Sequence, residues 1–172
     1  IQINILGSRI GLRKVYFFVF LLFISINCFA GEMVGEKAPE IFVKDWITNN
    51  PPVLENIEGK VYAVEFWATW CSPCVKNIPH LKKLTEEYKD QGLIMISLSE
   101  DRDEDEDKVQ KMVKDKEINY HVAMDKGTVD WFKVRYYPTA FVINHEGKIT
   151  WQGFPWNQGF EDAIASALEK IN

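Results

Sequence analysis

The chain has 172 residues, of which 47% are hydrophobic and 13% aromatic, and this supplies enough apolar material for one packed domain. Its formal net charge at pH 7 is −5. Because binding to phosphate groups requires clustered Lys and Arg, an acidic balance argues against a nucleic-acid partner.

The first thirty residues differ in composition from the rest of the chain. They carry three basic residues and no acid, then an unbroken apolar run over residues 15–24, and they end in Cys28-Phe29-Ala30. A basic flank, a short apolar core and a small-x-small ending are typical of a secretory signal peptide. We therefore predict a signal peptide over residues 1–30, cleaved after Ala30.

Two other interpretations of this segment remain open. Residues 15–30 could form an uncleaved membrane anchor, although the run is shorter than the roughly 20 apolar residues of a spanning helix. Lipidation of Cys28 is disfavoured by Asn27 beside it. Cleavage leaves one domain, residues 31–172, with a net charge of −8 and two of the three cysteines. Export places this domain in the periplasm or at the extracytoplasmic face of the membrane, where disulfides persist.

The hydrophobic pattern of the remaining chain predicts strands that alternate with helices. Two runs, residues 61–68 and 93–98, are almost wholly apolar, as in strands that are covered on both faces. Pro79 should bend the helix that precedes Gly92. The pattern predicts an α/β fold whose sheet has a parallel part and an antiparallel edge. The expected strands are 41–47, 61–68, 93–98, 139–144 and 148–153, the last two joined as a hairpin, and the expected helices are 74–89, 108–116, 129–134 and 160–171.

The segment Cys71-Ser72-Pro73-Cys74 lies between the first buried strand and its helix. Two intervening residues at a helix start can bring both sulfurs into disulfide geometry. Pro73 suits the first helical turn, where its missing N–H costs nothing. The free N–H groups and the dipole at a helix start favour a thiolate on Cys71, and the thiolate is the nucleophile. Cys74 can then resolve a mixed disulfide formed by Cys71.

The alternatives for this cysteine pair are a zinc site and an inert structural disulfide. Zinc usually takes four ligands, whereas the domain offers two cysteines and three scattered histidines, His80, His121 and His145. A structural disulfide that closes so small a loop removes little chain entropy. The pattern therefore favours redox chemistry and predicts neither a metal nor a cofactor.

Two further positions are candidates for the site. Glu65 is a lone acid in the first buried strand, where burial should raise its pKa and make it a proton acceptor for Cys74; the alternative is an edge position at which it reaches water. Tyr137-Pro138 precedes a predicted strand, and Pro138 is either an ordinary strand-start proline or a cis proline. Trp70 should be half-exposed beside Cys71 and able to contact a substrate.

These residues resemble the thioredoxin superfamily, and within it the TlpA/ResA-type exported reductases. The resemblance rests on the run Phe-Trp-Ala-Thr-Trp-Cys-Ser-Pro-Cys over residues 66–74, on Ile78-Pro79, and on the segment 137–148. It implies a thioredoxin fold with a central mixed sheet flanked by helices, a TlpA-like insertion over residues 100–125, Pro138 in cis beside the cysteines, and Tyr137 in the substrate groove.

The chain departs from that family at one position. The third residue after the second cysteine is often an acid in TlpA/ResA-type proteins, but here it is Asn77. This difference places the cytochrome c maturation role of the group in doubt. The lead-in over residues 34–39 is shared with the peroxiredoxins, but neither cysteine lies in the Pro-x-x-x-Thr-x-x-Cys setting that peroxidase chemistry needs.

The leading hypothesis is an exported protein-disulfide reductase that acts on protein thiol and disulfide substrates and is recharged by a membrane electron donor. A disulfide oxidase or isomerase of the same fold and a copper chaperone are the alternatives. The run of seven acids within residues 100–107 is interpreted as a solvated loop that favours the N-terminus of the following helix.

Overall fold

The computed structural model describes residues 33–54 and 59–170, so the predicted signal peptide and Cys28 lie outside the described residues. Residues 33–170 belong to one compact unit. Within the described ranges, no helix is both long enough and apolar enough to cross a membrane.

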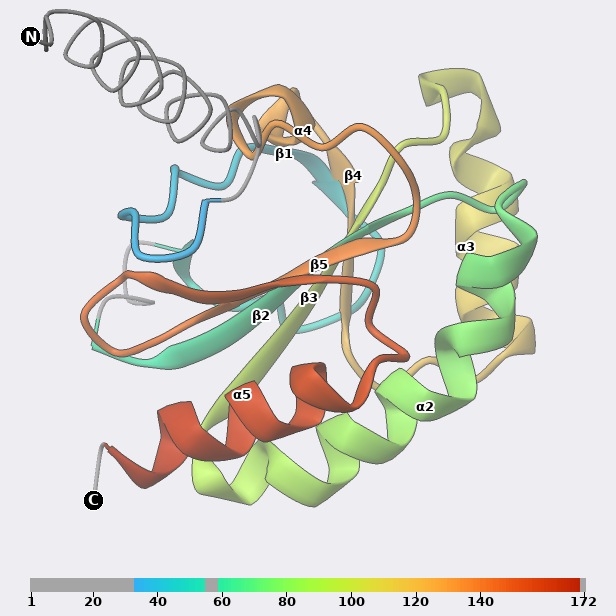
Figure 1. Cartoon of the computed structure of the whole chain (residues 1–172). Coiled ribbons are helices and arrows are strands. Elements are labelled where there is room, and N and C mark those ends of the chain that lie inside the picture. The colour runs from blue at the N-terminus through green and yellow to red at the C-terminus, as the bar shows by residue number, and fades with distance from the viewer. Residues whose placement is uncertain (1–32, 55–58, 171–172) are drawn as a thin grey trace, which may run out of the picture. The chain divides into compact units, whose positions relative to one another are not determined.

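One mixed sheet of six strands forms the centre of this unit (Figure 1). The strand order across the sheet is β1-β4-β3-β2-β5-β6. Strands β2, β3 and β4 run parallel, whereas β1, β5 and β6 each pair antiparallel with their neighbours. The strands are β1 (Val43–Trp46), β2 (Val61–Trp67), β3 (Leu93–Ser99), β4 (His121–Asp125), β5 (Thr139–Ile143) and β6 (Ile149–Gly153).

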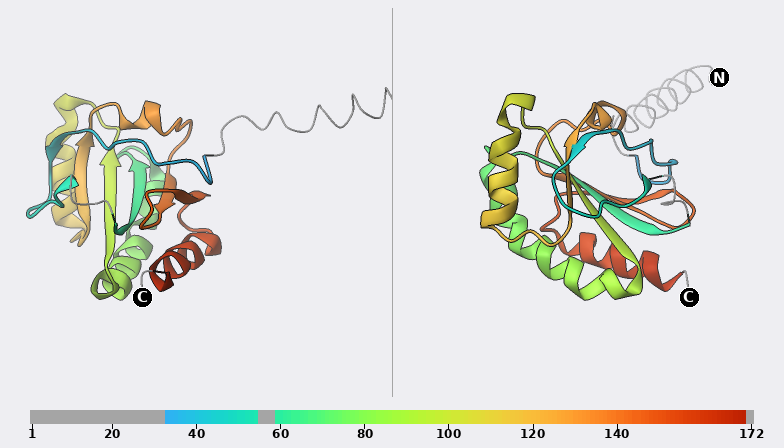
Figure 2. Two further views of the ribbon diagram at one scale, coloured as in Figure 1. Left: turned by 90° about the vertical axis from the view of Figure 1, so that its left-hand side faces the viewer. Right: turned by 180° about the vertical axis from the view of Figure 1, so that it is seen from behind.

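Helices cover the sheet on both faces, as two rotated views also show (Figure 2). One face packs against the three longest helices, and the other against a short helix and the segment that precedes β2. The long helices are α2 (Ser72–Tyr88), α3 (Glu106–Asp115) and α5 (Gln158–Glu169); the short elements are α4 (Thr128–Trp131) and the 3₁₀ turns η2 (Lys89–Gln91) and η3 (Asp103–Asp105).

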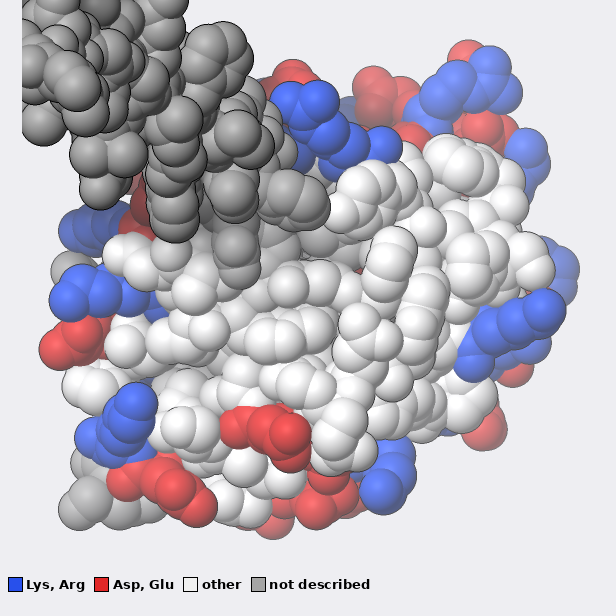
Figure 3. Space-filling model, in the orientation of Figure 1, with Lys and Arg blue, Asp and Glu red and all other residues white. Residues whose placement is uncertain are grey.

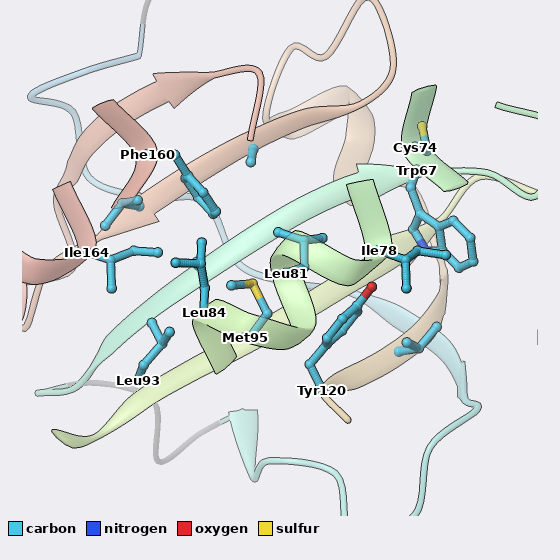
Figure 4. Close-up of a cluster of buried hydrophobic side chains, with 14 of the residues drawn as sticks. Trp67, Cys74, Ile78, Leu81, Leu84, Leu93, Met95, Tyr120, Phe160 and Ile164 are labelled. Carbon is cyan, nitrogen blue, oxygen red and sulfur yellow. The ribbon is translucent and has the colours of Figure 1, made fainter. Parts of the chain in front are cut away.

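Strand β2 is the most central element, because it is buried along its whole length between β3 and β5. Its side chains alternate between the two cores. Val61, Ala63 and Trp67 face the helices α2, α3 and α5, whereas Tyr62, Val64 and Phe66 face the opposite core. Figure 4 shows Cys74 beside Trp67 and Ile78, at one end of the core under α2. The redox pair therefore sits on the main hydrophobic core.

The predicted thioredoxin fold is confirmed, with small differences at the ends of elements. Helix α2 begins at Ser72, two residues before the predicted start, because Cys71 caps it. It continues through Pro79 and bends along its length (Figure 1). Gly92, which adopts a φ of 100°, follows η2 and turns the chain into β3. The predicted insertion over residues 100–125 forms η3, α3 and β4, and β4 extends the sheet beyond β3.

Candidate active site

Cys71 and Cys74 form a disulfide at the start of α2. Their sulfurs are 1.99 Å apart and their Cα atoms 5.3 Å apart. Cys71 is the N-cap of the helix, and its Sγ accepts a hydrogen bond from the backbone N–H of Cys74 at 3.3 Å. Cys71 is 5% exposed and Cys74 1% exposed, so Cys71 is the sulfur nearer to solvent. The helix start therefore directs an N–H group at the sulfur that sequence reasoning assigned as the nucleophile.

The loop that carries Cys71 is anchored to the end of the neighbouring strand β3. Asp101 accepts hydrogen bonds from the backbone N–H of Thr69 at 2.7 Å and from the Thr69 hydroxyl at 2.5 Å. The hydroxyl of Ser99 donates to the same carboxylate at 2.8 Å. Cys71 itself donates its N–H to the carbonyl of Ala68 at 3.1 Å. These bonds hold the segment between β2 and α2 in one conformation.

The loop before β5 brings Tyr137 and Pro138 to this end of the sheet. The Tyr137–Pro138 peptide bond is cis, so the proline is not an ordinary strand-start residue. Pro138 is buried and Tyr137 half-buried. The rings of Trp70 and Tyr137 meet edge to face with centroids 5.8 Å apart, and Trp70 is 66% exposed. The residue before Cys71 and the residue before Pro138 thus touch each other at the surface.

Glu65 lies in the middle of β2 and is 2% exposed, which excludes the alternative of an edge position that reaches water. Residues two apart in a strand share a face, so Glu65 lies on the same face as Ala63 and Trp67, which is the face that α2 covers. Burial raises the pKa of Glu65 to about 7, and a hydrogen bond from the Ser97 hydroxyl only partly offsets that effect. A carboxyl group that changes protonation near neutral pH can accept a proton there.

Sequence reasoning did not find Glu100, which directly follows β3. Burial and the neighbouring Asp125 carboxylate raise the pKa of Glu100 to about 8, and the nearby Tyr137 hydroxyl partly offsets that effect. The position of Glu100 in the sequence is the signal that could have identified it. Glu100 follows β3 as Cys71 follows β2, and the carboxyl ends of neighbouring parallel strands meet at one edge of the sheet.

The interpretation of residues 100–107 as a solvated loop is wrong at Asp101. Asp101 is 8% exposed, whereas Glu100 is half-buried. The remaining acids do follow the prediction: they are exposed or half-buried, and Glu106 and Asp107 occupy the first turn of α3, where negative charge is favourable. Within the described ranges, no group of three or more His, Cys, Asp or Glu side chains is arranged to hold a metal ion.

Asn77 is buried in α2, one turn after Cys74, and its side-chain Nδ2 has no hydrogen-bond partner. An amide at this position cannot ionise. The site therefore holds two carboxyl groups with raised pKa values, the buried Glu65 and the half-buried Glu100, and neither comes from α2.

A central mixed sheet, a cysteine pair at the first turn of a helix and a cis-proline loop beside it define a protein of the thioredoxin-like class. The comparison with family models makes this assignment more specific. Residues 34–152 match the AhpC/TSA family, and the chain belongs to that family.

Curated relatives are named thiol-disulfide oxidoreductase ResA. The protein from Bacillus cereus is 36% identical over 118 residues, which are 67% of this chain and 66% of the relative. The protein from Bacillus subtilis is 31% identical over 118 residues, 67% of this chain and 64% of the relative. The chain thus spans about two thirds of the length of these relatives.

Solved structures confirm the fold. A thiol:disulfide interchange protein of the thioredoxin family from Chlorobium tepidum superposes with a TM-score of 0.67 at 24% identity, covering 80% of this chain and 99% of that one. A thiol-disulfide isomerase from Corynebacterium glutamicum gives 0.68 at 20% identity, covering 76% and 96%.

Proposed function

We propose that this chain is an exported thiol–disulfide oxidoreductase that reduces disulfides in other exported proteins. The observation that carries the proposal is the Cys71–Cys74 disulfide at the N-terminus of α2, in a chain related to the ResA oxidoreductases. Export rests on the predicted signal peptide alone, and the direction of electron flow on the resemblance to reducing members of the family.

The reaction begins from the reduced pair. The Cys71 thiolate attacks one sulfur of the substrate disulfide, forms a mixed disulfide and releases the other substrate sulfur as a thiolate. The Cys74 thiolate then attacks the Cys71 sulfur and releases the second substrate thiol. The substrate gains two electrons and the enzyme is left with the Cys71–Cys74 disulfide, which is the state described above. A membrane electron donor returns it to the dithiol.

Glu65 accepts the proton of the Cys74 thiol before this second attack. Two facts support the assignment: Glu65 faces the helix that carries Cys74, and burial raises its pKa to about 7, so it is ionised in part of the molecules at neutral pH. The rate of mixed-disulfide resolution should therefore rise with pH through about 7. In a Glu65→Gln variant that inflection should disappear, and an unchanged pH profile would remove Glu65 from the mechanism.

The experiment that tests the proposed direction is the reduction potential of the cysteine pair. Equilibration with glutathione or dithiothreitol buffers, followed by tryptophan fluorescence, gives the midpoint. A reductant should have a potential of about −270 mV, near that of thioredoxin, whereas about −120 mV would identify an oxidant. A Cys71→Ser variant should lose all turnover, and Cys74→Ser should accumulate the mixed disulfide with substrate.

A further inference from the structure

Asn77 places a polar group in the hydrophobic core beneath α2. Its side chain is 5% exposed, and its Nδ2 has no hydrogen-bond partner among the described residues. Thr85, another buried polar residue of the helix, is satisfied because its hydroxyl donates to the carbonyl of Leu81 at 2.8 Å. A buried N–H without an acceptor costs free energy, since it loses water and gains no bond. The unpaired amide therefore points to an acceptor that forms in another state of the protein.

Cys74 lies one turn before Asn77 on the same face of α2. The two residues are three positions apart and both are buried, so both are directed at the core. Helical side chains lean toward the N-terminus of their helix, which directs the Asn77 amide at the turn that carries Cys74. In the oxidised pair the Cys74 sulfur is bonded to Cys71 and carries no charge. After reduction and loss of its proton it is a thiolate, which is a much stronger acceptor.

A second buried donor, the indole Nε1 of Trp67, is also without a partner in the described part of the chain. Trp67 lies beside Cys74, but Figure 4 shows its nitrogen on the edge of the ring toward Ile78 and away from the Cys74 sulfur. Asn77 is therefore the better placed of the two donors.

The features that stabilise a thiolate at this site favour Cys71 over Cys74. The backbone N–H at the helix start is directed at the Cys71 Sγ, 3.3 Å away. Figure 3 shows a continuous area without Lys or Arg where the loops before β5 and after β6 approach the start of α2, so this face offers no cation beside the helix start. Cys74 is 1% exposed, and such burial disfavours a charge on its sulfur.

The ionisable groups that face Cys74 from the other elements are acids and phenols. Glu65 lies on β2, and Tyr120 packs in the same core, where burial and the charge of Glu65 raise the pKa of Tyr120 well above its ordinary value. Tyr137 of the cis-proline loop packs against that core as well, and burial, with the charge of Glu100 next, raises its pKa to about 12. Each of these groups is negative when it ionises, so it opposes a second negative charge on Cys74. A neutral N–H donor does not.

We propose that the Nδ2 of Asn77 donates a hydrogen bond to the Cys74 sulfur once that sulfur is a thiolate, and that it thereby stabilises the nucleophile that resolves the mixed disulfide. This inference rests on the proposed function and deepens it. In the step concerned, the proton of the Cys74 thiol passes to Glu65 and the thiolate bonds to the Cys71 sulfur. The bond between Cys71 and the substrate breaks, and its electron pair leaves on the substrate sulfur. The amide exchanges no proton and acts only through its hydrogen bond.

The first test measures the thiolate fraction of Cys74 in the reduced protein by NMR titration with isotope-labelled cysteine. Asn77→Leu removes the donor and keeps a similar volume, so this fraction should fall about tenfold near neutral pH. Asn77→Asp keeps the size of the side chain, but when ionised it has no N–H and adds a negative charge, so its effect should be larger. The thiolate fraction of Cys71 should change less than that of Cys74 in both variants.

The rate at which the mixed disulfide is resolved gives a second readout, followed with a peptide substrate by rapid acid quench and mass spectrometry. A thiolate that forms less readily is also a stronger nucleophile, by roughly half of the change on a logarithmic scale. Near neutral pH the smaller thiolate fraction should therefore slow resolution about threefold in Asn77→Leu. At a pH at which Cys74 is fully ionised in both proteins, the variant should instead be about threefold faster. A merely structural role for Asn77 would slow the reaction at both pH values.

The matched control is Thr85→Val, because Thr85 is buried on the same helix and its hydroxyl already has a partner. This variant should leave the thiolate fraction of Cys74 unchanged. A fraction that both Asn77 variants leave unchanged, or a resolution rate that falls equally at both pH values, would overturn the inference while leaving the reductase function in place. Failure of the unaltered protein to reduce the peptide disulfide would count against the proposed function instead.

Discussion

Glu65 is a buried acid in β2 and Glu100 a half-buried acid at the end of the neighbouring strand β3, and their pKa values are raised by partly different causes. Beneath α2, desolvation alone raises the pKa of Glu65, and the Ser97 hydroxyl opposes it. At the rim, where the parallel strands end, burial of Glu100 acts together with the negative charge of Asp125 and Asp130. The pKa of Glu65 is therefore raised by burial alone, whereas the pKa of Glu100 is raised by burial and, in addition, by neighbouring charges that single substitutions can alter.

The largest expected effect concerns the interior. Because the pKa of Glu65 is raised from 4.5 to about 7, the folded protein retains a proton that the unfolded chain releases, so this residue lowers stability as pH rises from about 4.5 to 7 and stays costly above that. A Glu65→Gln variant should gain stability relative to the unaltered protein over that range, by about 3 kcal/mol.

Urea unfolding of the oxidised protein between pH 4 and pH 8 measures this difference. Glu87→Gln, an exposed position on α2, is the control and should leave the profile unchanged. A difference between Glu65→Gln and the unaltered protein that does not vary with pH would mean that the pKa of Glu65 is the same in the folded and unfolded states, contrary to its burial.

The next effect concerns the anchor of the active-site loop. An Asp101→Ala substitution removes the acceptor for Thr69 and Ser99 and leaves their donors without a partner, which should cost about 2 kcal/mol of unfolding free energy. Asp103→Ala is the control in the same acidic run, because Asp103 makes only an exposed ion pair with Lys44 at 3.3 Å. Equal losses in both variants would show that the anchor adds nothing.

The smallest expected effect is a change in the pKa of Glu100, and it separates Glu100 from Glu65 most directly. Asp125→Asn removes the largest charge that acts on Glu100, so the pKa of Glu100 should fall from about 8, although its burial keeps it above the ordinary range. Carboxyl NMR titration should show this fall, a smaller one in Asp130→Asn, and no change at Glu65. If neither substitution changed the pKa of Glu100, burial alone would raise that pKa, as it does for Glu65.

Much of this architecture could be predicted because its signals are local. The apolar runs at residues 61–68 and 93–98, the hairpin between β5 and β6 and the CxxC helix start each depend on neighbours in the chain. The burial of Glu65 was predicted in the same way, from one acid in an apolar strand.

The rest depends on contacts between distant segments. Asp101 looked like one of several solvated acids, and its burial depends on Thr69, 32 residues earlier. Glu100 depends on Asp125 and Tyr137, which reach it only when the sheet assembles. The stacking of the Phe154 and Trp156 rings is likewise a property of a folded loop. The periodicity of the sequence indicates which face of a strand a side chain occupies. It does not indicate which residues from other segments meet that side chain at the end of the sheet.

The contacts of the first described residues limit the order in which the edge of the sheet can assemble. The N–H of Gly35 donates to the carbonyl of Ile149, and the N–H of Met33 donates to the side chain of Gln152, 119 residues away. This segment covers the outer edge of β6, the last strand made during synthesis. A chain that emerges with its N-terminus first must therefore keep this segment unpaired until the C-terminal hairpin exists, because the contacts that cover the edge of β6 join residues far apart in the sequence.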